Sequence, residues 1–376
     1  MGTKIRTRIG PRNKPKSCPL VGPKVIPEGP WSLVLRVFVP LVWVILVSSK
    51  VTTWLQCAKA ASSFLLGKIP LVLNMDESVM KFNYGKNRGL IIDRRSLPPG
   101  HKHRKEQIDS SEAKAAVTFI GFVTHDHAIQ PKLPQIILGN KHKLLLPLMA
   151  ALALLKPENF YIWREESSWC NKGIICRILT LLAKCLAAYK ETHQIILVLD
   201  VASCHYHSSV LAYATRLGIR MVFVPARLTF LLQPLDSHCF SRLKRKLKQT
   251  WLSLAVESET GTVSHEAWLS AVMVVAPSVL CGVKWKSAFQ SNGLLGEHLL
   301  SARVLSYVGW KSPPAISGDI PSEHQLKSIF PKRAKIPRNS LFSWHFRPKA
   351  EAKAKAKAKA KASAWAKAAA AAPTLD

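Results

Sequence analysis

The stretch VPARLTFLLQPLDSHCFSRLKRKLKQTW, residues 224–251, places one carboxylate between an apolar run and a strongly basic segment. Residues 219–226 (IRMVFVPA) have the composition of a buried strand, and residues 241–256 have the apolar spacing of a helix. Asp236 therefore follows a strand by a short loop and stands where a basic helix begins. The simplest role for Asp236 is to cap that helix and to offset its positive charge.

Two further acids stand at the ends of predicted strands. Residues 69–78 (IPLVLNMDES) and 193–203 (HQIILVLDVAS) each predict an apolar strand that ends on a carboxylate, Asp76 in the first and Asp200 in the second. Ligands bind α/β sheets at the carboxyl ends of the strands, so we expect these two acids to converge and Asp236 to reach them from its helix. Taken singly, each acid is more commonly a turn former or a helix cap.

The pattern over residues 51–310 predicts an α/β domain. Between the acids, the strands predicted at 115–129 and 133–145 are placed to form a hairpin beside the first strand. The remaining predictions are helices at 54–68, 176–190, 208–218, 241–256 and 264–280.

Three carboxylates in apolar surroundings would repel one another and lose hydration unless a cation lay among them. A hard divalent ion such as Mg²⁺ or Mn²⁺ prefers oxygen ligands. Two such ions, about 3.5–4 Å apart, activate a water or a 3′-hydroxyl and stabilise the leaving oxygen of a phosphodiester. Metal-dependent phosphodiester chemistry is thus the functional hypothesis, and turn or cap formation by each acid is the structural alternative.

The charge balance points to a polyanionic partner. The chain has 54 Lys and Arg residues against 22 Asp and Glu residues, a formal net charge of +32. Such a surface attracts nucleic acid first and an acidic membrane surface second. The cations of the predicted basic helix would contact phosphates, or would simply form a solvated face; they are Arg242, Lys244, Arg245, Lys246 and Lys248.

The cysteine pattern favours a reducing compartment. Eight cysteines are scattered without any C-x-x-C pair, which predicts free thiols in a cytosolic or nuclear protein. Three His-x-His pairs raise the question of zinc, but each lacks a second ligand pair at a standard spacing; they are 101/103, 125/127 and 205/207.

The flanks differ in composition from the central domain. Residues 1–30 predict a basic disordered arm, residues 311–349 a basic, proline-rich linker, and residues 350–376 a low-complexity Lys/Ala tail. The apolar segment 31–50 contains a run, 31–49, that is about long enough to cross a bilayer. It predicts a buried helix or strand pair, with a membrane span and membrane association as the alternative.

Several blocks of this sequence together resemble one family. They are LNMDES (73–78), ILVLDVASCH (196–205) and FVPARLTFLLQPLD (223–236), with VTHDHAIQPKLPQIILGNK (123–141) between them and WKSAFQSNGLLGE (285–297) after them. They resemble the DDE-superfamily endonucleases, in particular the pogo-like branch of the mariner-related transposases. QPLD is the most specific of these motifs, and the resemblance extends over residues 51–310.

The resemblance implies a ribonuclease H-like mixed sheet and a DNA endonuclease or transposase that cuts and joins phosphodiesters. By the same resemblance, Asp76, Asp200 and Asp236 would bind two Mg²⁺ (or Mn²⁺) ions as catalytic ligands. His205 matches a histidine that follows the second acid and would lie near the site. DNA is then the expected partner and the nucleus the expected location, with a homodimer as one option for assembly.

Two departures from the family pattern keep an alternative open. Pogo-like transposases carry tandem helix-turn-helix modules before the catalytic domain, whereas residues 1–50 here contain a basic arm and an apolar stretch. Val201 follows the second acid where a small residue is common. The alternative is a domesticated, catalytically silent nucleic-acid-binding protein of transposon origin.

Overall fold

The computed structural model describes residues 30–63, 65, 67–82, 116–258, 262–295 and 300–331, with side chains from residue 44 onward. The chain divides into two units, Met1–Trp43 and Val44–Asp376, and the sheet with its covering helices belongs to the second. The predicted Lys/Ala tail, the predicted linker beyond residue 331 and the predicted basic arm up to residue 29 lie outside the described residues.

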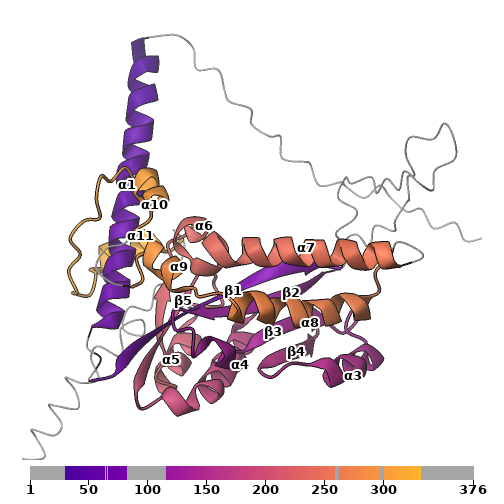
Figure 1. The fold of residues 1–376 in the computed structure, drawn as a ribbon. Coiled ribbons are helices and arrows are strands. Elements are labelled where there is room, and N and C mark those ends of the chain that lie inside the picture. Colours follow the sequence, from indigo (N-terminus) through magenta and orange to yellow (C-terminus); the bar gives the residue numbers. More distant parts are fainter. Residues whose placement is uncertain are drawn as a thin grey trace, which may run out of the picture. The chain divides into compact units, whose positions relative to one another are not determined.

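A six-stranded mixed sheet forms the centre of the fold (Figure 1). Its order is β4-β3-β2-β1-β5-β6; β2 runs antiparallel to both β1 and β3, and the other neighbouring pairs are parallel. The strands are β1 (Ile69–Lys81), β2 (Ala116–Thr124), β3 (Gln135–Asn140), β4 (Phe160–Glu165), β5 (His193–Leu199) and β6 (Arg220–Phe223).

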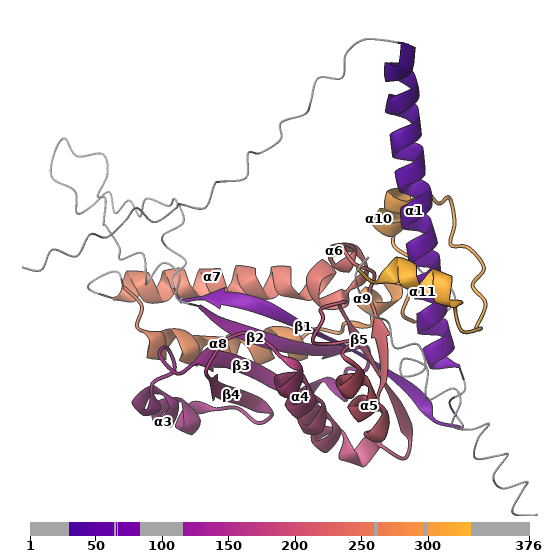
Figure 2. The same ribbon diagram turned by 180° about the vertical axis from the view of Figure 1, so that it is seen from behind.

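Helices cover both faces of this sheet. Helices α7 (Phe240–Glu257) and α8 (His265–Cys281) lie on one face, and α4 (Lys172–Cys185) and α5 (Ser208–Arg216) lie on the other (Figures 1 and 2). With both faces covered, the strands can be apolar on both sides, as their sequences are. The layering confirms the expected α/β fold with a ribonuclease H-like mixed sheet.

The basic helix α7 is amphipathic. Leu243, Leu247 and Trp251 recur every four residues and are buried, which fixes the face that α7 turns inward. The indole N–H of Trp251 donates a hydrogen bond of 3.1 Å to the carbonyl of Phe82, just past the end of β1. The cations between these apolar residues are consequently left on the outer face.

Helix α1 (Pro30–Ser62) runs without interruption through the predicted apolar segment and into the predicted helix at 54–68, but it ends at Ser62, so the last six residues of that prediction are wrong where the structure describes them. From residue 44 on it belongs to the second unit, where Trp54 is fully buried. Leu55 approaches Gly293 so closely that a Cβ on the glycine, whose φ is +75°, would lie 2.5 Å from the Leu55 side chain. Across the described residues, no helix combines the length and apolarity that a membrane span requires.

The remaining helices are short and link or flank these layers. They are η1 (Gln130–Lys132), α3 (Leu146–Leu155), η2 (Ala187–Tyr189), α6 (Thr229–Leu232), η3 (Leu235–Cys239), α9 (Lys286–Ser291), α10 (Ala302–Val308) and α11 (Glu323–Ile329).

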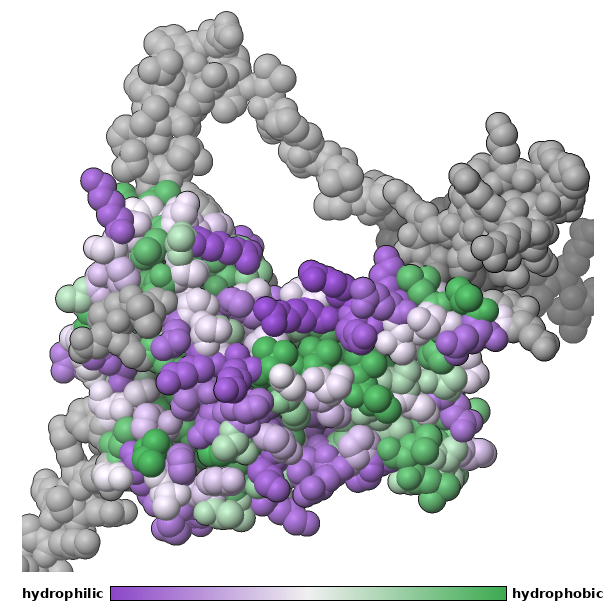
Figure 3. Space-filling model, viewed as in Figure 1, coloured by the Kyte–Doolittle hydropathy of each residue, from purple (hydrophilic) through white to green (hydrophobic). Residues whose placement is uncertain are grey.

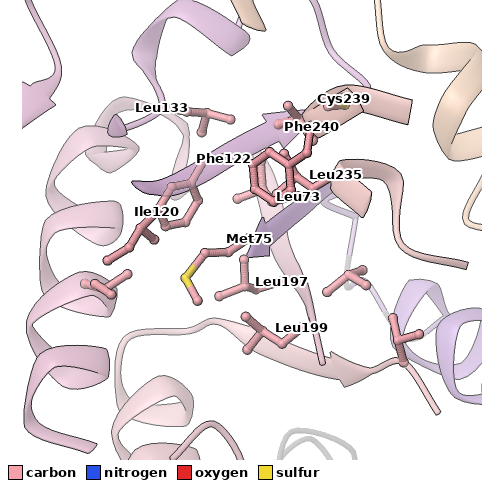
Figure 4. Packing of buried hydrophobic residues seen from close by; sticks show 14 of the residues in the cluster. Leu73, Met75, Ile120, Phe122, Leu133, Leu197, Leu199, Leu235, Cys239 and Phe240 are labelled. Carbon is pink, nitrogen blue, oxygen red and sulfur yellow. The ribbon is translucent and has the colours of Figure 1, made fainter. Parts of the chain in front are cut away.

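The core is continuous from the central strands to the segment that carries Asp236. Figure 4 shows buried side chains of β1, β2 and β5 together with those of η3 and the first residue of α7. Full burial of one Leu or Phe side chain contributes about 1.5–3 kcal/mol, so this cluster is a main source of stability. Its labelled members are Leu73, Met75, Ile120, Phe122, Leu133, Leu197, Leu199, Leu235, Cys239 and Phe240.

The predicted strand pair at 115–129 and 133–145 is confirmed by β2 and β3, which pair with each other and lie beside β1. Sequence analysis missed α3 and the edge strand β4. Strand β4, FYIWRE, is only partly buried and shows no apolar alternation, and α3 is apolar on all sides, so neither has the periodicity of its type.

Two glutamine side chains complete the hydrogen bonding of β2. The β2–β3 pairing runs from Thr118↔Leu138 to Ile120↔Ile136. Beyond it, the Gln135 amide accepts from the Phe122 N–H at 3.1 Å and donates to the Phe122 carbonyl at 2.9 Å. Gln130 likewise accepts from the Thr124 N–H at 2.8 Å and donates to the Phe122 carbonyl at 3.0 Å. Buried backbone groups past the end of the ladder thus stay paired.

We expect the substitution Gln135→Met to lower the free energy of unfolding by about 1–3 kcal/mol, because it keeps the side-chain length but leaves the buried Phe122 N–H without an acceptor. Chemical denaturation measures the change. Lys132→Ala, at an exposed position of the same connection, is the control and should change stability by less than about 0.5 kcal/mol. Equal stability of Gln135→Met and wild type would contradict this role of Gln135.

Candidate active site

Asp76 lies in the middle of β1, not at the end of a strand as the sequence suggested. Strand β1 continues to Lys81 because β2 pairs with it as far as Lys81↔Ala116. Strand β5 stops earlier, at Leu199, and its parallel register with β1 ends at Asn74↔Val198. Asp76 lies two residues after Asn74, and Asp200 lies two residues after Val198. The two acids therefore come to the same level along the strand direction.

The side chain of Asp76 faces η3 and α7. Its partner across the β1–β2 pair is Gly121, and paired residues of antiparallel strands share one face of the sheet. A Cβ on Gly121 would lie 3.2 Å from the Phe240 ring, so this face is the one covered by the start of α7. Asp76 is 8% exposed. The absence of a side chain at position 121 leaves room for Phe240 next to the buried acid.

Negative charge concentrates around Asp76. Burial raises the pKa of its carboxyl well above the usual range, and the charges of Asp236, Glu77 and Asp200 raise it further. The charges of the other two predicted ligands, Asp200 and Asp236, therefore both act on the buried Asp76. Such a group of acids favours a bound proton or a bound cation over full ionisation.

His205 connects Asp200 to a fourth acid. Its Nδ1 lies 2.6 Å from Asp200 Oδ1, and its Nε2 lies 3.1 Å from Glu77 Oε1. Burial acts to lower the pKa of His205, but hydrogen bonds with Asp200, Cys204 and Glu77 raise it well above the usual value. Burial acts to raise the pKa of Asp200, but the hydrogen bond and the charge of His205 lower this pKa below its usual range. The pair therefore favours imidazolium beside carboxylate.

Glu77 was missed by sequence reasoning, which considered only acids that seemed to end strands. Successive residues of a strand point to opposite faces, so Glu77 faces away from η3 and toward the segment that holds His205. The signal available was its position directly after Asp76 within the block LNMDES.

Asp236 lies in a π-helical turn, η3, that leads into α7. Neither η3 nor α7 has a side-chain cap hydrogen bond, so Asp236 does not act as the helix cap that its position first suggested. The residue is exposed, whereas Leu235 and Cys239 beside it are buried. Single π turns occur frequently at functional sites in helical segments.

One buried side chain, Asn74, links the three segments that carry the acids. Asn74 Oδ1 accepts the backbone N–H of Leu235 at 2.8 Å, and Asn74 Nδ2 donates to the carbonyl of Val198 at 3.0 Å. Asn74 and Val198 precede Asp76 and Asp200 by two residues, and Leu235 precedes Asp236 by one. Sequence reasoning also missed Asn74, although an amide inside an apolar strand was a visible signal.

The donor chemistry of Asp76, Asp200 and Asp236 fits a hard divalent cation, because all three offer carboxylate oxygens and the first is buried among like charges. Among the described residues, however, no three His, Cys, Asp or Glu side chains are gathered closely enough to hold a metal ion. Asp200 is engaged with His205 instead. Metal binding would therefore require side chains of the acids to turn toward a common point.

Two of the His-x-His pairs lie in the described part of the chain, and members of both have other partners. His125 Nδ1 lies 3.3 Å from the carbonyl of Val72, and His207 caps α5 by accepting the N–H of Ser209. The pair 101/103 lies outside the described residues.

The five predicted phosphate-contacting cations all lie exposed on α7, the helix that continues from η3. Figure 3 shows hydrophilic residues along this helix. The exposure of these cations is compatible with both alternatives, contact with phosphates and a solvated helix face. The five residues are Arg242, Lys244, Arg245, Lys246 and Lys248.

Comparison with known proteins identifies the class of this domain. Residues 131–284 match the family described as DDE superfamily endonuclease, so the chain contains a DDE superfamily endonuclease domain. The expected resemblance is confirmed. The matched range includes Asp200, His205 and Asp236 but begins after Asp76.

Two solved structures are similar to this chain. The crystal structure of the Mos1 mariner paired end complex with Mn matches at 14% identity and a TM-score of 0.32, covering 66% of this chain and 64% of that one. The Mos1 transposase paired-end complex with left transposon end matches at 14% identity and a TM-score of 0.31, covering 65% and 62%. The chain thus spans slightly under two thirds of the length of these structures. No curated protein matches it.

We expect Asn74→Leu to lower the free energy of unfolding by about 2–4 kcal/mol, because two buried backbone groups lose their partners at once. Hydrogen exchange at the Leu235 amide should accelerate. The matched control is Thr124→Val. It removes a different buried hydrogen bond, from the Thr124 hydroxyl to the carbonyl of Val72 in β1, and leaves the bond between Asn74 and η3 in place. If exchange at Leu235 changed equally in both variants, Asn74 would not be what holds η3.

We expect Asp76→Asn to stabilise the metal-free protein by about 1–3 kcal/mol, because it removes a buried charge that three neighbouring acids disfavour. The same variant should lose any rise in melting temperature that Mg²⁺ or Mn²⁺ gives the wild type. Thermal unfolding with and without the ions measures both effects. A metal-free Asp76→Asn variant less stable than wild type would contradict the repulsion inferred at this acid.

Proposed function

We propose that this domain is a metal-dependent DNA endonuclease of the transposase type, with Asp76, Asp200 and Asp236 as ligands of two Mg²⁺ or Mn²⁺ ions. The observation that carries the proposal is that the charges of Asp200 and Asp236 act on the buried Asp76 inside a DDE superfamily domain. When bound, the ions would supply the charge that activates a water or a 3′-hydroxyl and stabilises the leaving oxygen.

The three acids have different roles in this proposal. Asp76 offers a carboxylate from the buried side of the site, and Asp236 offers one from the exposed side, where a DNA strand can reach it. Asp200 stays ionised because His205 holds a positive charge against it. We therefore assign His205 as a positioning residue, whose second nitrogen is anchored by Glu77.

DNA is the proposed substrate and partner. The net charge of +32 and the exposed cations of α7 favour binding to the phosphate backbone, which does not depend on sequence. Because the proposed substrate is DNA, the proposed location of the protein is the nucleus. The proposed assembly is a homodimer.

A second candidate function is a catalytically silent DNA-binding protein of transposon origin. The observation that favours it is that, in the described part of the chain, the acids are not gathered as a metal-binding group. Val201, directly after Asp200, is a bulkier residue than is common there in the family that this sequence resembles. This candidate predicts salt-sensitive DNA binding without metal-dependent cleavage.

A nicking assay on supercoiled DNA with Mg²⁺ or Mn²⁺ distinguishes the two candidates. We expect nicking by the wild type and a loss of about 100-fold or more in Asp236→Asn, because metal ions supply several kcal/mol of charge stabilisation. Glu257→Gln, an exposed acid at the far end of α7, is the matched control and should retain full nicking. Equal nicking by wild type and Asp236→Asn would remove Asp236 from the metal site, and no nicking by the wild type would favour the silent protein.

A further inference from the structure

The buried side chain of Gln233 differs from every other buried amide side chain of the described core. Gln233 is fully buried, and in the part of the chain that the structure describes neither its amide nitrogen nor its amide oxygen meets a hydrogen-bond partner. Gln233 lies three residues before Asp236, in the block QPLD. The other buried amide residues of the described core all form side-chain hydrogen bonds; they are Asn74, Gln130, Gln135 and Asn292.

The backbone of Gln233 is fixed on both sides. Its N–H donates to the carbonyl of Thr229 at 2.9 Å, and its carbonyl accepts the N–H of Ser237 at 2.9 Å and the hydroxyl of Ser237 at 2.7 Å. A small shift of the backbone therefore cannot bring the amide to solvent. An unpaired buried amide opposes folding, and such an exception beside a functional site points to a partner that the amide meets in another state of that site.

We propose that Gln233 is a positioning residue, whose amide holds the carboxylate of Asp236 when Asp236 binds a divalent ion. The inference rests on the proposed function in one respect, the ion at the three acids. The –NH₂ group of Gln233 would donate to a carboxylate oxygen of Asp236. Carboxylates that bind a metal ion are themselves commonly hydrogen-bonded, and the second group fixes their orientation.

Gln233 and Asp236 belong to one turn of the chain. Because the carbonyl of Gln233 accepts the N–H of Ser237, four residues on, Gln233 opens the turn that carries Asp236. Side chains three residues apart in a helical turn are neighbours, with about 5–6 Å between their Cβ atoms, and a glutamine and an aspartate at such a spacing can form a hydrogen bond.

The exposed carboxylate of Asp236 needs a donor when it leaves water. Asp76 is buried and faces η3, so Asp236 has to turn from solvent toward the sheet before the two acids can share an ion. The turn itself is already held against β1, because the N–H of Leu235 donates to Asn74 Oδ1 at 2.8 Å. The inward movement takes a charged group to the buried side of η3, where its oxygens require hydrogen bonds.

The other buried side-chain amides around η3 have no donor to spare. Asn74 donates to two backbone carbonyls, at 3.0 and 3.2 Å. Asn292 donates to a carbonyl of α6 at 2.8 Å and to Ser237 Oγ at 3.2 Å. Among the described residues, Gln233 is thus the buried amide at this turn whose donors are free for Asp236.

Substitution by methionine, which keeps the length of the side chain but removes the amide, tests this role. We expect Gln233→Met to raise the melting temperature of the ion-free protein by about 2–4 °C, because an unpaired buried polar group is lost. We also expect it to weaken binding of Mn²⁺ to the full chain roughly 10-fold, a usual loss when a group that orients a metal ligand is removed. Thermal unfolding in EDTA measures the first effect, and isothermal titration calorimetry with Mn²⁺ alone measures the second.

Gln135→Met is the matched control, since Gln135 is also a buried amide but both its donor and its acceptor are bonded to Phe122. It should lower the melting temperature and leave the affinity for Mn²⁺ within about 2-fold of the wild type. Gln233→Leu, a second apolar variant, should change melting temperature and Mn²⁺ binding in the same directions as Gln233→Met. In the Asp236→Asn background, Gln233→Met should weaken Mn²⁺ binding no further, because no carboxylate remains for the amide to hold.

A lower melting temperature of both Gln233→Met and Gln233→Leu would overturn the proposal, since the amide would then have a partner in the ion-free protein, such as a bound water. Unchanged Mn²⁺ binding by Gln233→Met would also overturn it, while the proposed metal site would stand. Failure of the wild type itself to bind Mn²⁺ would contradict the proposed function, and the role of Gln233 would fall with it.

Discussion

The hydrogen bonds of the buried Asn74 amide are the constraint on which the candidate site depends. This one side chain joins β1, β5 and the start of η3 within one or two residues of Asp76, Asp200 and Asp236. Each of the three acids comes from a different part of the chain, so their convergence has to be fixed by contacts between segments. A buried amide that satisfies two backbone groups does this with defined geometry, which apolar packing alone does not provide.

The site also brings together groups that oppose folding. Asp76 is buried among like charges, and Asp200 requires the positive charge of His205 to remain ionised. The surrounding core, which extends from β1, β2 and β5 to Phe240, compensates for this local cost. Sites in which buried charge is tolerated in this way are commonly functional, because the same repulsion favours a bound cation.

Much of the fold could be predicted from the sequence, and the exceptions have physical reasons. Strands β1, β2, β3, β5 and β6 and the helices α4, α5, α7 and α8 carry strong apolar periodicity, so their types were predictable from residues alone. Strand β4 and helix α3 lack that periodicity. The end of β1 was misplaced because pairing with β2, which is separated from it in the sequence by more than 30 residues, extends it past Asp76.

The sequence by itself determined the class of the domain and its candidate acids, since strand patterns and short motifs are local properties of the chain. Only the tertiary structure decided which groups hold and surround those acids: His205 between Asp200 and Glu77, and Asn74 between three segments. These relations join residues that are distant in the chain. Their geometry depends on strand register and helix packing, which no local pattern specifies.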